Sequence, residues 1–196
     1  MNKIFFASFI SVLFNPFLIL VFLPFVLVYN ATASVSASIG WTAFSFIFLL
    51  TLAQIVLYLV RKGVFTNLDV SVRQQRPLLF NILVVTGIVY IIFLYILHAP
   101  RVLYVMIVSL LFGVLVARIV NVRIKASLHV ATVAALILGV VLGYGAKYVF
   151  LLPLIPLVAW ARVKLKRHTV SETVTGGVVG SLLLLFIYGF YEVFLK

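Results

Sequence analysis

Two histidines and one glutamate stand among arginines and lysines in a chain that has almost no other acidic residues. His168 is followed four positions later by Glu172, and His129 lies in a second basic segment. If a helix has begun by His168, this spacing puts Glu172 on the same helical face, within reach of the imidazole. A carboxylate that accepts the Nδ1 proton leaves the Nε2 lone pair outward, as nucleophilic and general-base histidines require.

Arginines in the same segments predict an anion site beside this histidine. Arg76, Arg162 and Arg73 carry guanidinium forks, which bind phosphate oxygens in a bidentate manner. Helix N-termini favour an anion further. Pro77 is placed to open a helix as a first-turn proline, and residues 125–129 lead directly into an apolar run.

The composition places this cluster in a membrane protein. The chain has 196 residues, of which 66% are hydrophobic and 9% are charged. A soluble domain carries about 45–50% apolar and about 25% charged residues. No compact fold of this size has enough interior to hide such an excess, so lipid must be part of the solvent.

Seven apolar runs could cross the bilayer, and all but the last, which contains Glu192, lack charged residues. A spanning helix needs about 20 residues, with a range of about 17–25, and snorkelling Lys and Arg side chains lengthen the shorter runs. We therefore expect an all-α, polytopic bundle of about seven transmembrane helices that forms a single domain over residues 1–196. Pro153 and Pro156 predict a kink in the sixth run. The runs are Ile4–Tyr29, Trp41–Val60, Leu78–Leu97, Val102–Ala117, Val130–Gly145, Tyr148–Ala161 and Val174–Leu195.

Six spans remain the alternative if the first run is removed, as a cleaved signal peptide would be, or lies differently. The run exceeds the roughly 7–15 apolar residues of a signal peptide, which favours a retained helix. Gly139/Gly143 and Gly176/Gly180 have the small-xxx-small spacing of helix-packing motifs, and we expect them to act inside the bundle. The sequence leaves the oligomeric state open.

The basic residues of the loops lie on one face of the membrane. An even number of spans separates the three loops that carry most of them, so these loops meet on the same side. The positive-inside rule puts that side in the cytoplasm, in an integral protein of the cell membrane. Only Arg101, Lys147 and Lys196 lie opposite; the basic face holds Lys3, Arg61, Lys62, Arg73, Arg76, Arg118, Arg123, Lys125, Arg162, Lys164, Lys166 and Arg167.

Scarce residue types exclude several classes of chemistry. The absence of cysteine excludes disulfides, thiolate nucleophiles and Cys-ligated zinc. Three acidic residues cannot build an Asp-rich metal cluster, which argues against Mg²⁺-dependent prenyl- or phosphatidyl-transferases. A net charge of +12 does not indicate nucleic acid as a partner, because membrane topology explains the basic loops first.

In order along the chain, these residues resemble the type-2 phosphatidic acid phosphatase family of integral-membrane lipid phosphatases, bacterial acid phosphatases and vanadium haloperoxidases. The family pattern is K-x6-R-P, then P-S-G-H, then S-R-x5-H-x3-D. Here the matching segments are Asp69-x6-Arg76-Pro77, Ala126-Ser127-Leu128-His129 and Ala161-Arg162-x5-His168-x3-Glu172. The resemblance covers a phosphatase-like core of roughly residues 60–185.

The resemblance implies a metal-independent phosphatase that acts on a lipid phosphate or an isoprenoid diphosphate and needs no cofactor. His168 would attack phosphorus to form a phosphohistidine, and Glu172 would fix its tautomer. His129 would protonate the departing oxygen. The phosphate would be held by Arg76, Arg162 and Ser127 together with nearby backbone N–H groups.

Departures from the family pattern leave other functions open. Asp69 stands where the family has lysine, so Arg73 or Lys125 would supply the missing cation, and Leu128 replaces the glycine of the second motif. A phosphotransferase, an inactive descendant, and a transporter or scramblase that binds anionic headgroups remain alternatives. Against a coupled transporter, only the last span carries an ionisable residue clear of its ends.

The resemblance and the charge asymmetry disagree on the membrane side. Many bacterial members of the family work at the outer face. The basic excess favours the cytoplasm even after the candidate phosphate ligands Arg73, Arg76, Lys125 and Arg162 are discounted, so we expect a cytoplasmic site.

Overall fold

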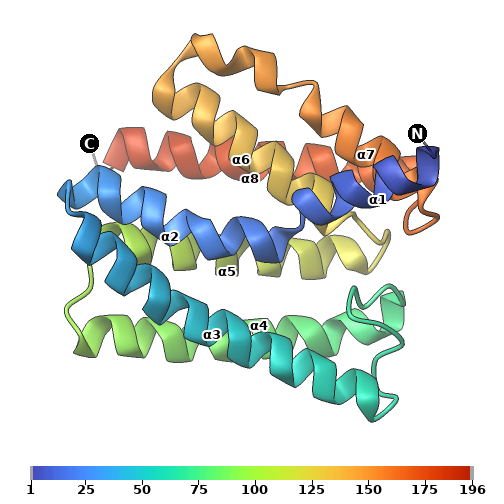
Figure 1. The fold of residues 1–196 in the computed structure, drawn as a ribbon, viewed down its shortest axis with the longest axis horizontal. Helices are drawn as coiled ribbons and strands as arrows, with labels where there is room; N and C mark the ends of the chain where they lie inside the picture. Colours follow the sequence, from blue (N-terminus) through green and yellow to red (C-terminus); the bar gives the residue numbers. More distant parts are fainter. Residues whose placement is uncertain (1, 195–196) are drawn as a thin grey trace. The chain divides into compact units, whose positions relative to one another are not determined.

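The computed structural model describes residues 2–194, with the side chains described as far as residue 189. Within this range every regular element is a helix. The helices group into two compact units (Figure 1). Unit 1 combines the residues up to Pro16 with those from Ile119 onward, and unit 2 is Phe17–Arg118. The all-α prediction is confirmed.

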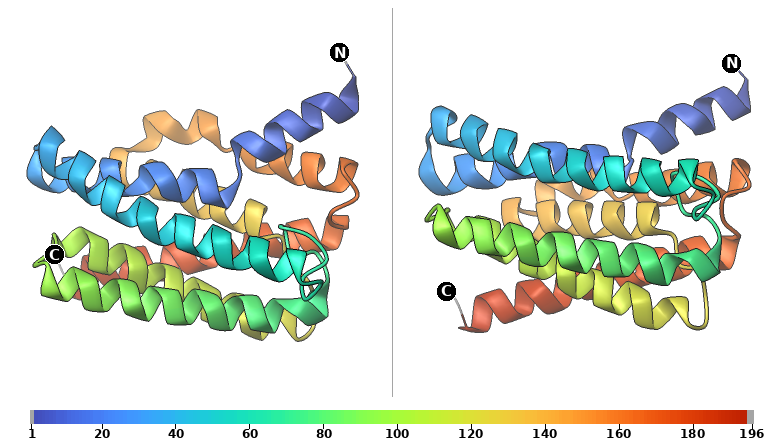
Figure 2. Two further views of the ribbon diagram at one scale, coloured as in Figure 1. Left: turned by 60° about the horizontal axis from the view of Figure 1, so that its bottom comes forward. Right: turned by 90° about the horizontal axis from the view of Figure 1, so that it is seen from below.

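Unit 2 is held by aromatic side chains at the centre of its helices. The rings of Phe44 and Phe48 lie 5.8 and 5.0 Å from the ring of Tyr90, between centroids. The Tyr90 hydroxyl shares a 2.7 Å hydrogen bond with the Ser45 hydroxyl, which joins α3 to α4; these helices lie side by side (Figure 2). The elements are α2 (Pro16–Thr32), α3 (Val35–Arg61), η1 (Arg73–Gln75), α4 (Arg76–Ile96) and α5 (Arg101–Asn121), whose last turn belongs to unit 1.

Unit 1 depends on a close approach of two helices, α6 and α8. A side-chain carbon at Gly176 would lie 2.5 Å from the carbonyl oxygen of Ser127, and one at Gly180 would collide with the carbonyl of Ala131. The predicted packing role of Gly176 and Gly180 is thus confirmed. Helix α1 packs along α7 in the same unit. The elements are α1 (Lys3–Leu13), α6 (Leu128–Tyr144), η2 (Ala146–Leu151), α7 (Leu154–Lys164) and α8 (Val170–Phe194).

Among residues 2–194, six helical segments are long and apolar enough to cross a membrane. The fifth predicted run forms α6, which has 17 residues and stands at the lower limit for a span. The protein is therefore a polytopic membrane protein. The six segments are Lys3–Thr32, Val35–Arg61, Arg73–Ile96, Arg101–Asn121, Ala146–Lys164 and Val170–Gly189.

The first predicted run lies within the candidate span Lys3–Thr32, but its helix is not continuous. Helix α1 ends at Leu13 and α2 begins at Pro16. Proline has no N–H to donate to the preceding turn and disfavours helical geometry at the residue before it, here Asn15. The run is helical on both sides of this break.

The sixth predicted run is interrupted rather than kinked. It forms the short helix η2, and α7 begins only after Pro153, which occupies the N-cap. Pro156 follows within the first turn of α7, where a missing N–H removes no helical hydrogen bond. Both prolines thus act at a helix start.

Candidate functional site

Helix α8 begins with a capping box. The hydroxyl of Thr169 accepts a hydrogen bond from the backbone N–H of Glu172 at 3.3 Å. In return, Oε2 of Glu172 accepts one from the backbone N–H of Thr169 at 3.1 Å. This reciprocal pair satisfies N–H groups that a helix start leaves without partners. It also turns the Glu172 side chain back toward the residues that precede the helix.

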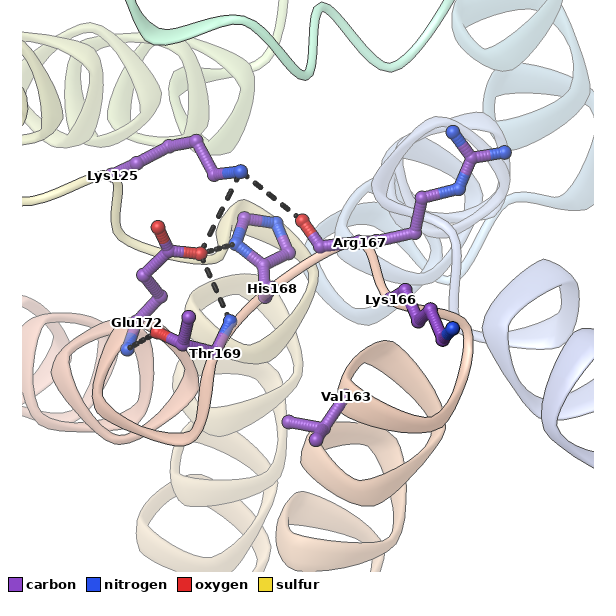
Figure 3. A pocket seen from close by; sticks show the side chains of 7 residues that line it. All are labelled: Lys125, Val163, Lys166, Arg167, His168, Thr169 and Glu172. Carbon is purple, nitrogen blue, oxygen red and sulfur yellow. Dashed lines mark hydrogen bonds and ion pairs between the residues drawn. The ribbon is translucent and has the colours of Figure 1, made fainter.

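His168 lies directly before this cap. Its Nδ1 is 2.9 Å from Oε2 of Glu172 (Figure 3). The predicted contact is present, but the expected reason for it is wrong, because α8 begins at Val170 and not by His168. The capping box, rather than a shared helical face, brings the carboxylate to the imidazole. The His168 side chain is only 4% exposed, so its orientation is fixed by its surroundings.

Lys125 adds a cation beside the same carboxylate oxygen. Its Nζ lies 3.6 Å from Oε2 of Glu172 and donates a 3.2 Å hydrogen bond to the backbone carbonyl of Arg167. Lys125 thereby joins the loop before α6 to the loop before α8.

These groups line a shallow depression of about 350 Å³ in unit 1 (Figure 3). Three of the lining side chains are cationic and one is anionic, so the depression carries an excess of positive charge. This excess favours an anionic group there. Its lining residues are Lys125, Val163, Lys166, Arg167, His168, Thr169 and Glu172.

Ser127 is the N-cap residue of α6. Its backbone N–H donates a 3.0 Å hydrogen bond to the carbonyl of Glu172, which joins the starts of α6 and α8. The Ser127 hydroxyl is buried and has no hydrogen-bond partner among residues 2–194. Ser127 does not line the depression.

Arg162 is buried in the last turn of α7, shortly before the loop that carries His168. Its Nη1 donates a 2.8 Å hydrogen bond to the hydroxyl of Ser11 in α1. Its backbone carbonyl accepts hydrogen bonds from the N–H groups of Arg167 at 3.1 Å and His168 at 3.4 Å. Arg162 therefore fixes the turn that presents the histidine, although it does not line the depression.

His129 occupies the first turn of α6 and is half-buried. It is not among the side chains that line the depression. Its assigned role as a general acid stays a prediction from the sequence motif.

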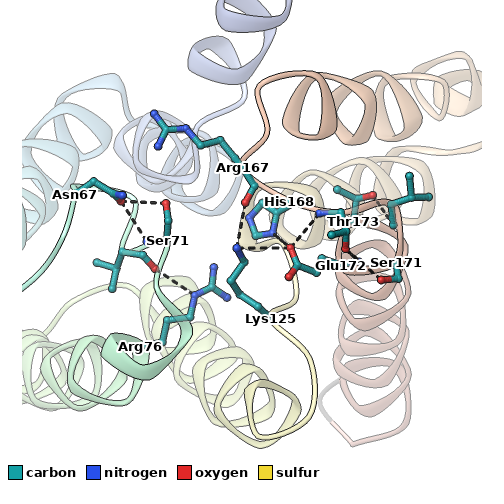
Figure 4. A network of polar contacts seen from close by, with 12 residues as sticks. Asn67, Ser71, Arg76, Lys125, Arg167, His168, Ser171, Glu172 and Thr173 are labelled. Carbon is teal, nitrogen blue, oxygen red and sulfur yellow. Dashed lines mark hydrogen bonds and ion pairs between the residues drawn. The ribbon is translucent and has the colours of Figure 1, made fainter.

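Arg76 and Arg73 belong to unit 2. Arg76 is the buried first residue of α4, and its Nε donates a 3.3 Å hydrogen bond to the carbonyl of Val70 (Figure 4). The loop before it is braced by Asn67, whose Oδ1 accepts hydrogen bonds from the N–H and hydroxyl of Ser71. Arg73 is exposed in η1. The phosphate-binding roles of both arginines rest on the sequence motif.

Besides Lys166, which like Arg167 belongs to a basic loop, sequence reasoning missed three contributors to this site. Thr169 had a readable signal, because Thr-x-x-Glu is the pattern of a capping box. Arg167 was assigned to membrane topology, as basic loops usually are. Ser11 had no local signal at all, since it stands 151 positions from Arg162.

Comparison with protein-family models finds no matching family, and comparisons with curated proteins and with solved structures find no significant similarity. Within the described part of the chain, no group of three or more His, Asp or Glu side chains is gathered so that it could hold a metal ion. A function must therefore be argued from the geometry of the site and from the order of its motifs.

Replacement of Thr169 by alanine tests the capping box. Loss of the hydroxyl costs about 1 kcal/mol at a typical helix N-cap, which corresponds to roughly fivefold faster local opening. We expect this acceleration in hydrogen exchange of peptides that cover residues 168–176. Thr169→Ser keeps the hydroxyl and should exchange like the parent. Equal acceleration in both variants would contradict the capping role.

Proposed function

We propose that the protein is a metal-independent membrane phosphatase that hydrolyses a lipid phosphate or an isoprenoid diphosphate through a phosphohistidine at His168. One observation carries the proposal: the 2.9 Å contact between Nδ1 of His168 and Oε2 of Glu172, at the wall of a basic depression. A histidine oriented by a carboxylate beside cations is the arrangement that nucleophilic attack on a phosphoryl group requires.

The His168–Glu172 contact assigns the nucleophilic nitrogen. A carboxylate accepts hydrogen bonds, so it favours the tautomer that carries the proton on Nδ1. The lone pair then resides on Nε2, which attacks phosphorus while the bond to the leaving oxygen breaks. The leaving oxygen takes a proton, for which the motif nominates His129. Water then attacks the phosphohistidine, and phosphate leaves as the Nε2–phosphorus bond breaks.

Cations around the depression support the charge that develops on the phosphoryl oxygens. Lys125, Lys166 and Arg167 line it, and Lys125 is held in place by Glu172 and by the carbonyl of Arg167. Preorganised charges supply a large share of the rate enhancement in such reactions. Lys125 also offsets the negative charge of Glu172 at 3.6 Å. The resemblance of the three sequence motifs to the phosphatase family nominates four further phosphate ligands: Arg76, Arg162, Ser127 and Arg73.

The position of the depression along the helices fits a lipid substrate. Its residues cluster where the candidate span Ala146–Lys164 ends and the candidate span Val170–Gly189 begins. The end of a spanning helix lies near the headgroup region of the bilayer. A phosphate headgroup would reach the cations there, while its apolar tail stays in the hydrocarbon.

One observation favours a non-enzymatic alternative. Glu172 has a structural role as a capping residue, so its place beside His168 does not by itself require catalysis. A transporter or scramblase could use the same basic depression to hold anionic headgroups. Its transport would survive the loss of His168 and would depend on the summed basic charge.

Phosphate release from detergent-purified protein separates these functions. Phosphatidate, phosphatidylglycerol phosphate and a polyprenyl diphosphate are offered in the presence of EDTA, and we expect release from at least one. His168→Ala should abolish it. Glu172→Gln should lower it by about 10²- to 10⁴-fold, because glutamine can still serve in a capping box but cannot fix the tautomer as a carboxylate does.

His98→Asn is the matched control for these variants. His98 is exposed in unit 2 and has a φ of 52°, a conformation that asparagine tolerates. Its activity should equal that of the parent. Absence of release from all three substrates, or full activity of His168→Ala, would contradict the phosphatase proposal.

We also propose that the site faces the cytoplasm, on the strength of the basic excess in its loops. The chain has no cysteine, so single-cysteine variants report topology cleanly. Arg123 and Lys147 are exposed and flank α6. In intact cells a membrane-impermeant maleimide should label Lys147→Cys and spare Arg123→Cys until the membrane is permeabilised. The opposite pattern would place the site outside.

A further inference from the structure

A serine from the start of the chain is bonded to a buried arginine of the site. The Ser11 hydroxyl accepts a 2.8 Å hydrogen bond from Nη1 of Arg162, and both residues are buried, at 6% and 4% exposure. Ser11 belongs to none of the motifs that the sequence displays. Burial of a guanidinium costs free energy unless its N–H groups find acceptors, so this hydrogen bond lowers the cost of burying Arg162.

Helix α1 is built to deliver this serine to α7. Ala7, Ile10 and Ser11 are its buried residues, and their spacing places them on one helical face. Phe6 extends the contact, since its ring centroid lies 6.0 Å from that of Trp160 in α7. Ser11 is the polar member of this otherwise apolar contact face.

Arg162 also connects the contact with Ser11 to the turn that carries His168. The Arg162 carbonyl accepts hydrogen bonds from the N–H groups of Arg167 and His168, which close the turn between α7 and α8. The guanidinium and the carbonyl of one residue thus tie α1 to the segment that carries the nucleophile. A change in the position of Arg162 would alter both the cation and the turn.

We propose that Ser11 is a positioning residue of the phosphatase site, acting through Arg162. The inference rests on the proposed function, and it adds α1 to the elements that build the site. The sequence motif makes Arg162 a phosphate ligand; although its side chain does not line the depression, Ser11 holds Nη1 of its guanidinium in one orientation, and the Arg162 carbonyl holds the turn of His168. Without the hydroxyl the cation is misaligned, so the site binds the phosphate headgroup less tightly.

The test compares steady-state kinetics of four α1 variants on the lipid phosphate that the wild type cleaves fastest. For Ser11→Ala we expect KM to rise about tenfold while kcat is largely kept, since a hydrogen bond to a charged group contributes at least about this factor. The inhibition constant of inorganic phosphate should rise in parallel. A loss of folded protein alone would lower the apparent kcat and leave KM unchanged. A rise in KM with kcat kept therefore identifies a positioning role for Ser11.

Three variants serve as comparisons. Ser11→Thr keeps the hydroxyl and should restore KM. Ser11→Cys keeps the shape of the side chain but accepts hydrogen bonds poorly, so it should show the same kinetic split even if Ser11→Ala is not recovered folded. Ser8→Ala is the matched control, because Ser8 is an exposed serine one turn earlier in α1.

Failure of this inference can be told from failure of the proposed function. If Ser11→Ala and Ser11→Cys behave like Ser8→Ala while the wild type is active, Ser11 is not a positioning residue and the phosphatase proposal stands. If the wild type releases phosphate from no lipid phosphate, both proposals are overturned. A double-mutant cycle of Ser11→Ala with Arg162→Ala in thermal unfolding reports the contact itself in either case.

Discussion

The start of α8 depends on the carboxylate of Glu172, which caps the helix and contacts His168. Oε2 of Glu172 accepts the N–H of Thr169 at 3.1 Å and lies 2.9 Å from Nδ1 of His168. A helix N-terminus presents unsatisfied N–H groups and a partial positive charge, both of which a carboxylate in the first turn offsets. The same atom therefore stabilises the helix and orients the imidazole, with Lys125 3.6 Å away to balance its charge.

The rest of unit 1 is arranged so that other helix ends reach this point. Glycines at 176 and 180 let α8 approach the start of α6, and the N–H of Ser127 then bonds to the carbonyl of Glu172. Hydrocarbon offers no hydrogen bonds, so polar groups near the bilayer must find partners within the protein. Arg162 follows this rule with its bond to Ser11, which gives an apolar N-terminal helix a polar contact in the site.

Composition and apolar run length were sufficient to predict the fold class, because 66% hydrophobic residues leave few alternatives. The His168–Glu172 contact is also predictable from spacing, although the capping signature of Thr169, and not a helix that includes His168, explains it. The break before Pro16 had a sequence signal in the proline itself. The Ser11–Arg162 contact had none, because it depends on how α1 packs against α7 and no local pattern encodes that packing.

The proposed function requires covalent chemistry at His168, and trapping the intermediate tests it most directly. Purified protein is mixed briefly with a lipid phosphate that carries a radiolabelled phosphoryl group, then quenched in alkali and digested. We predict label that is stable to alkali and labile to acid, as phosphohistidine is, on the peptide that contains His168. Hydrolysis by the wild type with no labelled peptide, or with label on another residue, would contradict the account.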